Sequence, residues 1–284
     1  MAKVKATVHG AVSIVSAIAS KKGATLGISL KVEATVETSI GKGIIIQSEN
    51  KSLSSRLINK TIEKIVSKKD LEKNKITITL TSEIPTGYGL KSSSAISSVV
   101  ALACAKIFKP KLTDKQILLA GVDASIETKV SITGAYDDAC SCYYGGFNVT
   151  DNGKRNRINF EKIPPNLSAV IFIPRNRKRG NLKKLKIFSS IFNNAWELAN
   201  EKKYWEAMTI NGLATSSILN SDPKIIVDLI DKGALGASVS GNGPSIAAIV
   251  KKENISNVKK IFSNLEGSII VSKINNKKAE VHEL

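Results

Sequence analysis

The feature that most constrains this chain is a run of glycines and hydroxyl-bearing residues at positions 85–95, which reads PTGYGLKSSSA. The alternating segment Ile76–Leu80 before it predicts a strand, and the apolar spacing from Ile96 to Ile107 after it predicts a helix. The serines therefore begin a helix, where the first N–H groups lack intrahelical partners and attract anions. Glycines let a polyphosphate approach the backbone closely. The run predicts a phosphate-binding loop.

Two other interpretations of this run can be weighed on the residues alone. A Walker A loop requires Gly-Lys-Ser/Thr after four spacer residues, whereas this chain has Leu90-Lys91-Ser92, so that interpretation fails. The other is a glycine turn before a serine-capped helix that binds nothing, because Ser is a preferred N-cap residue. Further motifs are needed to decide between a ligand site and such a turn.

Two such motifs follow along the chain. Glu127 precedes Asp138 by eleven residues, and a Tyr-Gly-Gly triplet at 144–146 comes soon afterwards. A second glycine-rich stretch at 233–245 reads GALGASVSGNGPS. Three motifs in a fixed order are more specific than one.

In this order the motifs resemble those of the GHMP kinases, and the chain is identified as a member of that superfamily. The run at 85–95 matches every fixed position of the ATP-binding signature Pro-x-x-x-Gly-Leu-x-Ser-Ser-x-Ala. The second glycine-rich stretch resembles the C-terminal motif of the superfamily, and the eleven-residue interval resembles that of mevalonate kinases. The finer resemblance is to archaeal-type shikimate kinases, over segments 9–19, 22–28, 89–94 and 133–140.

The resemblance implies an α+β fold of two lobes, with the active site in the cleft between them. Residues 1–163 are expected to form a lobe like ribosomal protein S5 domain 2, and residues 164–284 a ferredoxin-like lobe. The implied activity is phosphate transfer from ATP to the 3-hydroxyl of shikimate, in chorismate and aromatic amino-acid biosynthesis. Homoserine kinase is the alternative because residues 240–245 also resemble its motif, although homoserine kinases carry Asn where Asp138 stands.

The residue-by-residue match also implies roles at the site. The expected ATP-binding residues are Pro85, Gly87, Tyr88, Gly89, Leu90, Lys91, Ser92, Ser93, Ser94 and Ala95. Ser93 and Glu127 are expected to hold Mg²⁺, a hard cation that prefers oxygen ligands. Asp138 is expected to accept the proton of the substrate hydroxyl, with the adjacent Asp137 as the alternative. Lys91 either adds positive charge near the phosphates or faces solvent.

The substrate itself constrains its binding residues. Shikimate carries a carboxylate and three hydroxyls, so its site should combine a cation with small polar groups. Arg175 is the candidate partner of the carboxylate. The other candidates are Ser13, Ser16, Gly241 and Asn242.

Net charge raises a different class of function. The chain has 42 Lys and Arg against 24 Asp and Glu, a formal net charge of +18, as nucleic-acid-binding proteins often do. The densest basic segment, 175–186, is not interleaved with aromatic residues, so a solvated face or an anionic small substrate is the better interpretation. Nucleic-acid binding is the alternative from another class, and it leaves Glu127 and Asp138 unexplained.

Cysteine use and hydropathy address the compartment. The three cysteines form no C-x-x-C pair and no metal-ligand spacing with the two histidines, so neither zinc nor a disulfide framework is expected. No stretch is long enough to span a membrane. The apolar segment 11–19 resembles a secretory signal only superficially, because Ser13 and Ser16 interrupt it. We expect a cytoplasmic protein whose oligomeric state, a homodimer included, stays open.

Local patterns predict the remaining elements. A capping box at 113–116 begins the helix that ends near Glu127, and residues 148–159 form a polar hairpin or loop. Strands at 246–250 and 268–272 are expected to pair, with a helix at 255–263 between them. Other expected elements are strands at 28–37, 43–48 and 169–173 and helices at 53–67, 182–220 and 222–232.

Overall fold

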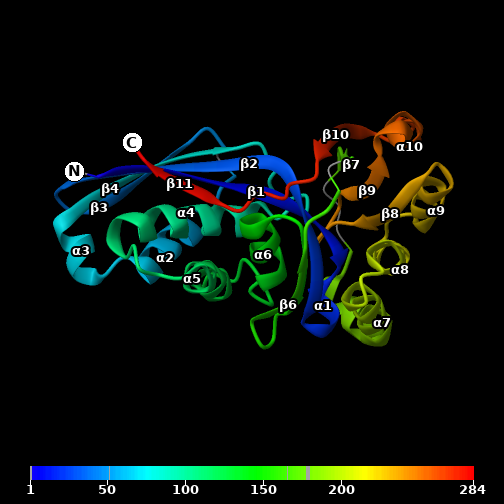
Figure 1. The fold of residues 1–284 in the computed structure, drawn as a ribbon, viewed down its shortest axis with the longest axis horizontal. Helices are drawn as coiled ribbons and strands as arrows, with labels where there is room; N and C mark the ends of the chain where they lie inside the picture. Colours follow the sequence, from blue (N-terminus) through cyan, green and yellow to red (C-terminus); the bar gives the residue numbers. More distant parts are fainter. Residues whose placement is uncertain (1, 51, 165, 177–179) are drawn as a thin grey trace.

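The structure is a computed structural model that describes residues 2–50, 52–164, 166–176 and 180–284. Two β-sheets lie side by side, each with its own helices, and the chain ends lie together at the far edge of the first sheet (Figure 1). Pro165, next to the expected lobe boundary, lies outside the described residues, as do residues 177–179 of the basic segment.

The first sheet has seven strands and belongs to the N-terminal lobe. Its main order is β11-β1-β2-β4-β3, and β5 and β6 form a hairpin attached to the beginning of β2. The strands are β1 (Lys3–Val15), β2 (Lys22–Ile40), β3 (Gly43–Ser48), β4 (Asn74–Ser82), β5 (Phe147–Asp151), β6 (Asn156–Glu161) and β11 (Glu280–Glu283).

Helices cover one face of this sheet, and the central one carries the predicted phosphate-binding residues at its start (Figure 1). That helix is almost entirely buried because its small and β-branched side chains pack between the sheet and its neighbours. The helices of this lobe are α2 (Ser55–Ile65), α3 (Lys68–Lys73), α4 (Ser92–Phe108), α5 (Asp114–Glu127) and α6 (Tyr136–Tyr144).

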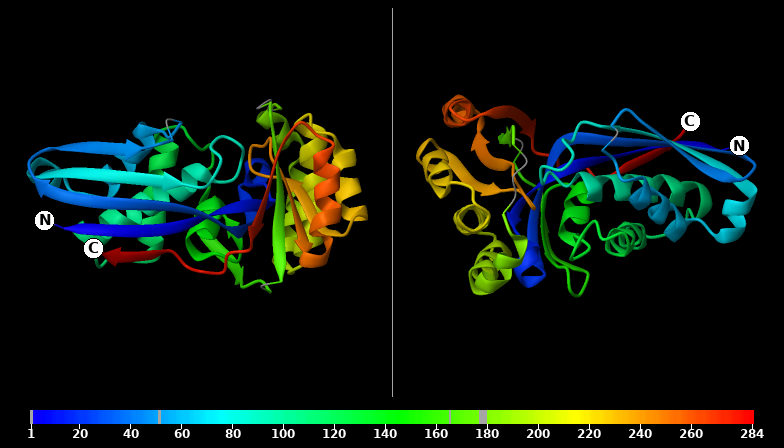
Figure 2. Two further views of the ribbon diagram at one scale, coloured as in Figure 1. Left: turned by 90° about the horizontal axis from the view of Figure 1, so that it is seen from above. Right: turned by 180° about the vertical axis from the view of Figure 1, so that it is seen from behind.

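The second sheet is antiparallel, with the order β10-β7-β9-β8 that defines a ferredoxin-like arrangement. Its strands are β7 (Leu167–Pro174), β8 (Ala234–Val239), β9 (Ile246–Lys251) and β10 (Gly267–Lys273). Helices α9 and α10 lie on its outer side, away from the first lobe (Figure 2). The remaining helical segments are α1 (Ala17–Ser20), η1 (Leu182–Phe188), α7 (Ser189–Asn200), α8 (Tyr204–Ile218), α9 (Pro223–Asp231), η2 (Lys252–Asn254) and α10 (Ile255–Ser263).

One expected strand pairing is wrong. Strands β9 and β10 do not pair with each other, because each pairs with a different edge of β7. The chain also returns to the first lobe after β10, where β11 pairs with β1 and brings Val4 opposite Glu283. The C-terminal residues therefore complete the N-terminal sheet, which a single cut between 163 and 164 does not describe.

The two lobes share a core. One apolar cluster runs from the first sheet into β7, α7 and α8, and a second lies between the second sheet and its outer helices. At the junction Phe147 of β5 stacks on Tyr204 of α8, with ring centroids 3.8 Å apart. This packing fixes the relative position of the lobes and so of the residues between them. Within the described parts of the chain, every helix is too short or too polar to cross a bilayer.

Candidate active site

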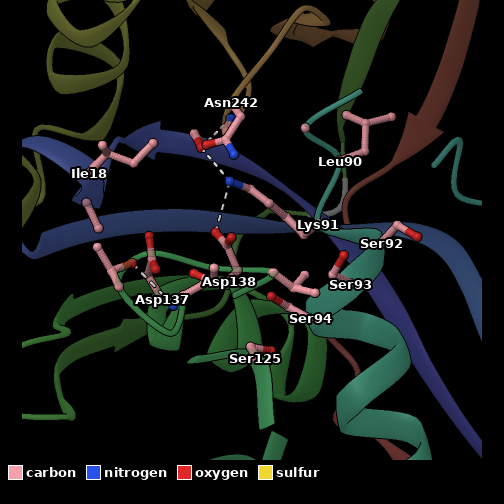
Figure 3. A pocket seen from close by; sticks show the side chains of 18 of the residues that line it. Ile18, Leu90, Lys91, Ser92, Ser93, Ser94, Ser125, Asp137, Asp138 and Asn242 are labelled. Atoms are coloured by element: carbon pink, nitrogen blue, oxygen red, sulfur yellow. Dashed lines mark hydrogen bonds and ion pairs between the residues drawn. The ribbon is translucent and has the colours of Figure 1, made fainter. Parts of the chain in front are cut away.

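A cavity of about 310 Å³ lies where the lobes meet (Figure 3). Its wall is built by four parts of the chain that are far apart in sequence. These are the segment from the end of β1 into α1, the phosphate-loop run with the start of α4, the residues from α5 to α6, and the second glycine-rich stretch. The cavity is large enough for a small polar molecule.

The start of α4 forms one wall. Lys91 is its N-cap residue and has φ 66°, in the left-handed region, while Gly87 and Gly89 before it also have positive φ. Ser92 and Ser93, in the first turn, line the cavity together with these loop residues. The helix therefore directs its unpaired N–H groups and its positive dipole end toward the cavity, which favours an anion there.

The second glycine-rich stretch is joined to this loop by hydrogen bonds. Ser240 Oγ donates to the Gly89 carbonyl at 2.9 Å, and Ser245 donates to the Tyr88 carbonyl through both its hydroxyl and its N–H. A side chain at Gly89 would overlap the Ser240 carbonyl, so only glycine fits this contact. The two motifs thus form a single rigid wall.

A buried ion pair lies next to the loop. Lys91 Nζ lies 2.9 Å from Asp138 Oδ1, in α6, and donates a hydrogen bond of 2.7 Å to Ser13 Oγ (Figure 3). The side chains of Lys91 and Asp138 are 4% and 17% exposed. Ser13 Oγ also accepts the Gly241 N–H at 2.9 Å, so the ion pair is tied to both lobes. Charges held this far from water interact more strongly than a surface pair does.

Asp137 takes a different position from its neighbour. Its side chain is buried, and Asn152 Nδ2 donates to its Oδ1 at 2.7 Å. Burial first, and then the nearby charge of Asp138, raise the pKa of Asp137 to about 7, against the attraction of Lys91. Both carboxyl groups line the cavity.

Comparison with known proteins places this architecture. The family model of the GHMP kinases N terminal domain matches residues 56–146. A shikimate kinase of Methanosarcina acetivorans is 36% identical over 281 residues, which cover 96% of this chain and 95% of the relative. The chain belongs to the archaeal-type shikimate kinases of the GHMP kinase superfamily. A shikimate kinase of Pyrococcus furiosus is 32% identical, covering 90% of this chain and 94% of its own.

Solved structures support the fold of this family. A homoserine kinase of Cytophaga hutchinsonii superposes with a TM-score of 0.76 at 20% identity, covering 99% of this chain and 98% of that one. A mevalonate kinase of Methanococcus jannaschii gives 0.74 at 19% identity, with 96% and 98% covered. The expected α+β GHMP kinase fold is therefore confirmed, and family membership makes the chain a kinase that uses ATP with a divalent metal.

Most of the residues expected to bind ATP line the cavity of this kinase. Those that do so are Gly87, Gly89, Leu90, Lys91, Ser92, Ser93 and Ser94. Pro85, Tyr88 and Ala95 are not part of its lining. Tyr88 contributes its carbonyl to the contact with Ser245, and Ala95 is fully buried in the core. These three support the loop from behind.

The expected pairing of Ser93 with Glu127 is not observed. Glu127 is the last residue of α5 and lies outside the cavity, where its carboxylate forms ion pairs with Lys64 and, at 3.1 Å, with Lys60. Hydrogen bonds from Lys64 and Lys60 lower the pKa of Glu127. Ser125, two residues earlier on the helix, faces the cavity instead.

Four of the five expected substrate residues line the cavity. Ser13, Ser16, Gly241 and Asn242 do so, and Ser16 is also fixed because its N–H donates to Asn211 Oδ1 at 2.9 Å. Arg175 is exposed at the end of β7 and is not part of the lining. Lys91 is the one cation among the described lining residues, so the expected partner of a carboxylate is not found there.

Sequence patterns missed part of the wall. Ala17 and Ile18 of α1 and the loop residues Val130 and Ile132 add an apolar surface, and Ile132 is 68% exposed. A clear signal for them was lacking, because isolated apolar residues in loops are common in any sequence. The helical spacing of Ser125 relative to Leu118 and Val122 was the one usable clue.

The donor atoms of the cavity suit a hard cation shared with a nucleotide. Among the described residues there is no cluster of three or more His, Cys, Asp or Glu side chains able to hold a metal alone. Hydroxyl oxygens of Ser93 and its neighbours do line the cavity. Such a site fits a metal that takes most of its ligands from phosphate and water.

Proposed function

We propose that this enzyme transfers the γ-phosphoryl group of ATP to the 3-hydroxyl of shikimate, giving shikimate 3-phosphate and ADP. The observation that carries the proposal is that the Asp138 carboxylate and the N-terminus of α4 line one buried cavity. A proton acceptor and a phosphate-binding element are the two parts that phosphoryl transfer to an alcohol requires. The relatives named shikimate kinase support the choice of substrate.

The phosphates of ATP would lie against the loop at 87–94. Its glycines leave the backbone accessible, and the N–H groups at the start of α4 donate to phosphate oxygens without a side-chain charge. The Ser93 hydroxyl would share Mg²⁺ with the nucleotide, and the bound ion neutralises charge that develops on the phosphates. ATP as co-substrate also favours a cytoplasmic location for the enzyme.

Asp138 would accept the proton of the 3-hydroxyl as the new bond to phosphorus forms. Lys91 holds this carboxylate in place from the phosphate-loop side, so the acceptor is fixed relative to the phosphates. Ser13 fixes Lys91 in turn and is itself tied to Gly241 of the other lobe. The geometry thus couples closure of the two motifs to the position of the proton acceptor.

An assay of ADP release tests this function. Wild type is offered shikimate, homoserine or mevalonate with ATP and Mg²⁺, and we expect turnover with shikimate alone. Asp138→Asn should reduce kcat by a factor of about 10³, since general-base groups contribute about 10²- to 10⁴-fold. Asp123→Asn is a matched control, because Asp123 pairs with Arg155 at 2.8 Å and lies outside the cavity. Turnover with homoserine instead would overturn the substrate.

A further inference from the structure

The proposed mechanism leaves the Asp137 carboxyl without a task. It lines the same cavity as Asp138 but lies on the side of Ile18 and α1, while Asp138 faces Lys91 (Figure 3). The side chain is only slightly exposed, at 4% for the residue. A carboxyl buried at a cavity wall costs folding free energy unless it makes compensating interactions.

Asn152 fixes the orientation of this carboxyl. Its Nδ2 donates to Asp137 Oδ1 at 2.7 Å, and its Oδ1 accepts the Asp137 N–H at 3.1 Å. Thr150 Oγ1 donates to the same Asn152 oxygen at 2.8 Å, and Thr25 Oγ1 donates to the Asp137 carbonyl at 2.8 Å. All of these residues are buried. The carboxyl is therefore held in a single orientation before any substrate binds.

The neighbouring strand leaves room for the second oxygen. A Cβ atom at Gly23 would overlap Asp137 Oδ2, and it would also crowd the Ala17 methyl group. Oδ2 thus lies between β2 and α1, on the part of the wall that Ala17 and Ile18 continue. Oδ1 is held by Asn152, so Oδ2 is the oxygen positioned for a ligand.

Helix stabilisation does not account for this arrangement. An acidic residue in the first turn of α6 gains only about 0.3–1 kcal/mol from the helix dipole. Burial and the charge of Asp138 nevertheless raise the pKa of Asp137 to about 7, which means that its charged form is disfavoured where it lies. A residue kept under this penalty beside a cavity points to a ligand.

We infer that Asp137 binds the 4-hydroxyl of shikimate while Asp138 takes the proton from the 3-hydroxyl, so that Asp137 selects a vicinal diol. The inference rests on the proposed function. Carbon 3 of shikimate has an alkene carbon on one side and carbon 4 on the other, so the 4-hydroxyl is the one hydroxyl adjacent to the reacting group. Two carboxyls from consecutive residues match two adjacent hydroxyls, and either form of the Asp137 carboxyl can hydrogen-bond a hydroxyl.

This assignment also gives a reason for discrimination among alcohols. Homoserine has one hydroxyl, so it would leave the Asp137 carboxyl buried and unpaired. A site built to hydrogen-bond a hydroxyl rejects an analogue that lacks it, because the polar group of the protein then loses its partner.

The test combines a protein variant with substrate analogues. Shikimate, 4-deoxyshikimate and 5-deoxyshikimate are compared in wild type and Asp137→Ala, with kcat/KM as the readout. The Asp137→Ala change should lower kcat/KM for shikimate by about 10- to 100-fold, the range for one hydrogen bond to such a group. It should lower the value for 5-deoxyshikimate equally and leave that for 4-deoxyshikimate within about threefold.

Gly23→Ala provides a second route to the same result. The added methyl group displaces the Asp137 carboxyl without removing it, so the same dependence on the 4-hydroxyl is expected. Gly153→Ala, in the hairpin between β5 and β6, is the matched control, since a Cβ there is 3.2 Å from Asp151 Oδ1 and away from the cavity.

The outcomes are distinguishable. Equal losses of kcat/KM with all three substrates would show that Asp137 is structural and would overturn the inference while leaving the proposed function intact. Wild type that uses 4-deoxyshikimate as efficiently as shikimate would overturn it without any variant. Absence of shikimate turnover in wild type would overturn the proposed function, and the hydroxyl assignment with it.

Discussion

Two carboxylate–lysine ion pairs near this active site have the same chemistry and opposite surroundings. Asp138 and Lys91 are nearly buried in the cavity, whereas Glu127 pairs with Lys60 and Lys64 at the surface, with 43% of its side chain exposed. The sequence interval between Glu127 and Asp138 suggested that both carboxylates serve the reaction. The comparison teaches that burial and the direction of the helix, and not the interval, decide which carboxylate reaches the substrate.

The largest expected difference between the two pairs is in catalysis. Asp138→Asn should lower kcat by about 10³-fold because it removes the proton acceptor. Glu127→Gln should leave kcat within about threefold, because its carboxylate lies outside the cavity. Steady-state rates with saturating ATP and shikimate measure both. A loss of 10² or more in Glu127→Gln would restore Glu127 as a metal ligand and break the comparison.

Removal of the lysines should separate the pairs by stability. Lys91→Met leaves the Asp138 carboxylate largely buried without its cation, and we expect a loss of about 3 kcal/mol in the free energy of unfolding. Lys64→Met leaves Glu127 in water and should cause no measurable loss. Urea unfolding followed by circular dichroism measures both. Equal losses would mean that the Asp138 pair behaves as a surface pair.

The stability should also depend on pH through Asp137. The folded state binds its proton up to pH about 7, whereas the unfolded chain loses it near the ordinary pKa of 3.8. The free energy of unfolding therefore has this contribution in full below pH 3.8 and loses it as the pH rises to about 7. Asp137→Asn should flatten that decline. Unfolding curves from pH 4 to 8 test it, and an unchanged slope in the variant would assign the decline to other groups.

The smallest expected effect concerns salt. The Glu127 pair is exposed, so a change from 0.05 to 1 M NaCl should screen it and erase any stability difference between wild type and Glu127→Gln. The loss caused by Lys91→Met should persist at both concentrations, because the partner charge is largely buried. Thermal unfolding at the two salt concentrations distinguishes these behaviours, and a salt-sensitive Lys91→Met loss would argue for a hydrated cavity pair.

Local signals in the sequence were sufficient for much of the fold. The capping box at Thr113 is present in the structure, and α5 ends at Glu127 as expected. These signals depend on residues within one helical turn, so one sequence contains them completely. The start of α4 and its glycine loop were predictable for the same reason.

Partner choice between distant strands could not be read in this way. Strand β7 separates β9 from β10, and no residue pattern in either strand states which neighbour it takes. Strand β1 was also missed, because it is buried on both faces over its second half and lacks the alternation of a half-exposed strand.

The site shows the same division between local and distant information. Lys91 reaches Asp138 because α4 and α6 pack together, which no spacing in the sequence expresses. Glu127 fails to reach Ser93 because α5 ends there and a loop precedes α6, so eleven residues along the chain do not fix a distance.

The most direct test of the account is a single-turnover measurement of phosphoryl transfer. Excess enzyme, wild type or Asp138→Asn, is mixed with ATP, Mg²⁺ and limiting shikimate, and shikimate 3-phosphate is quantified after rapid quenching. We predict that Asp138→Asn binds shikimate with nearly unchanged affinity but forms product about 10³-fold more slowly. Transfer within tenfold of the wild-type rate would show that Asp138 is not the proton acceptor and would contradict the account.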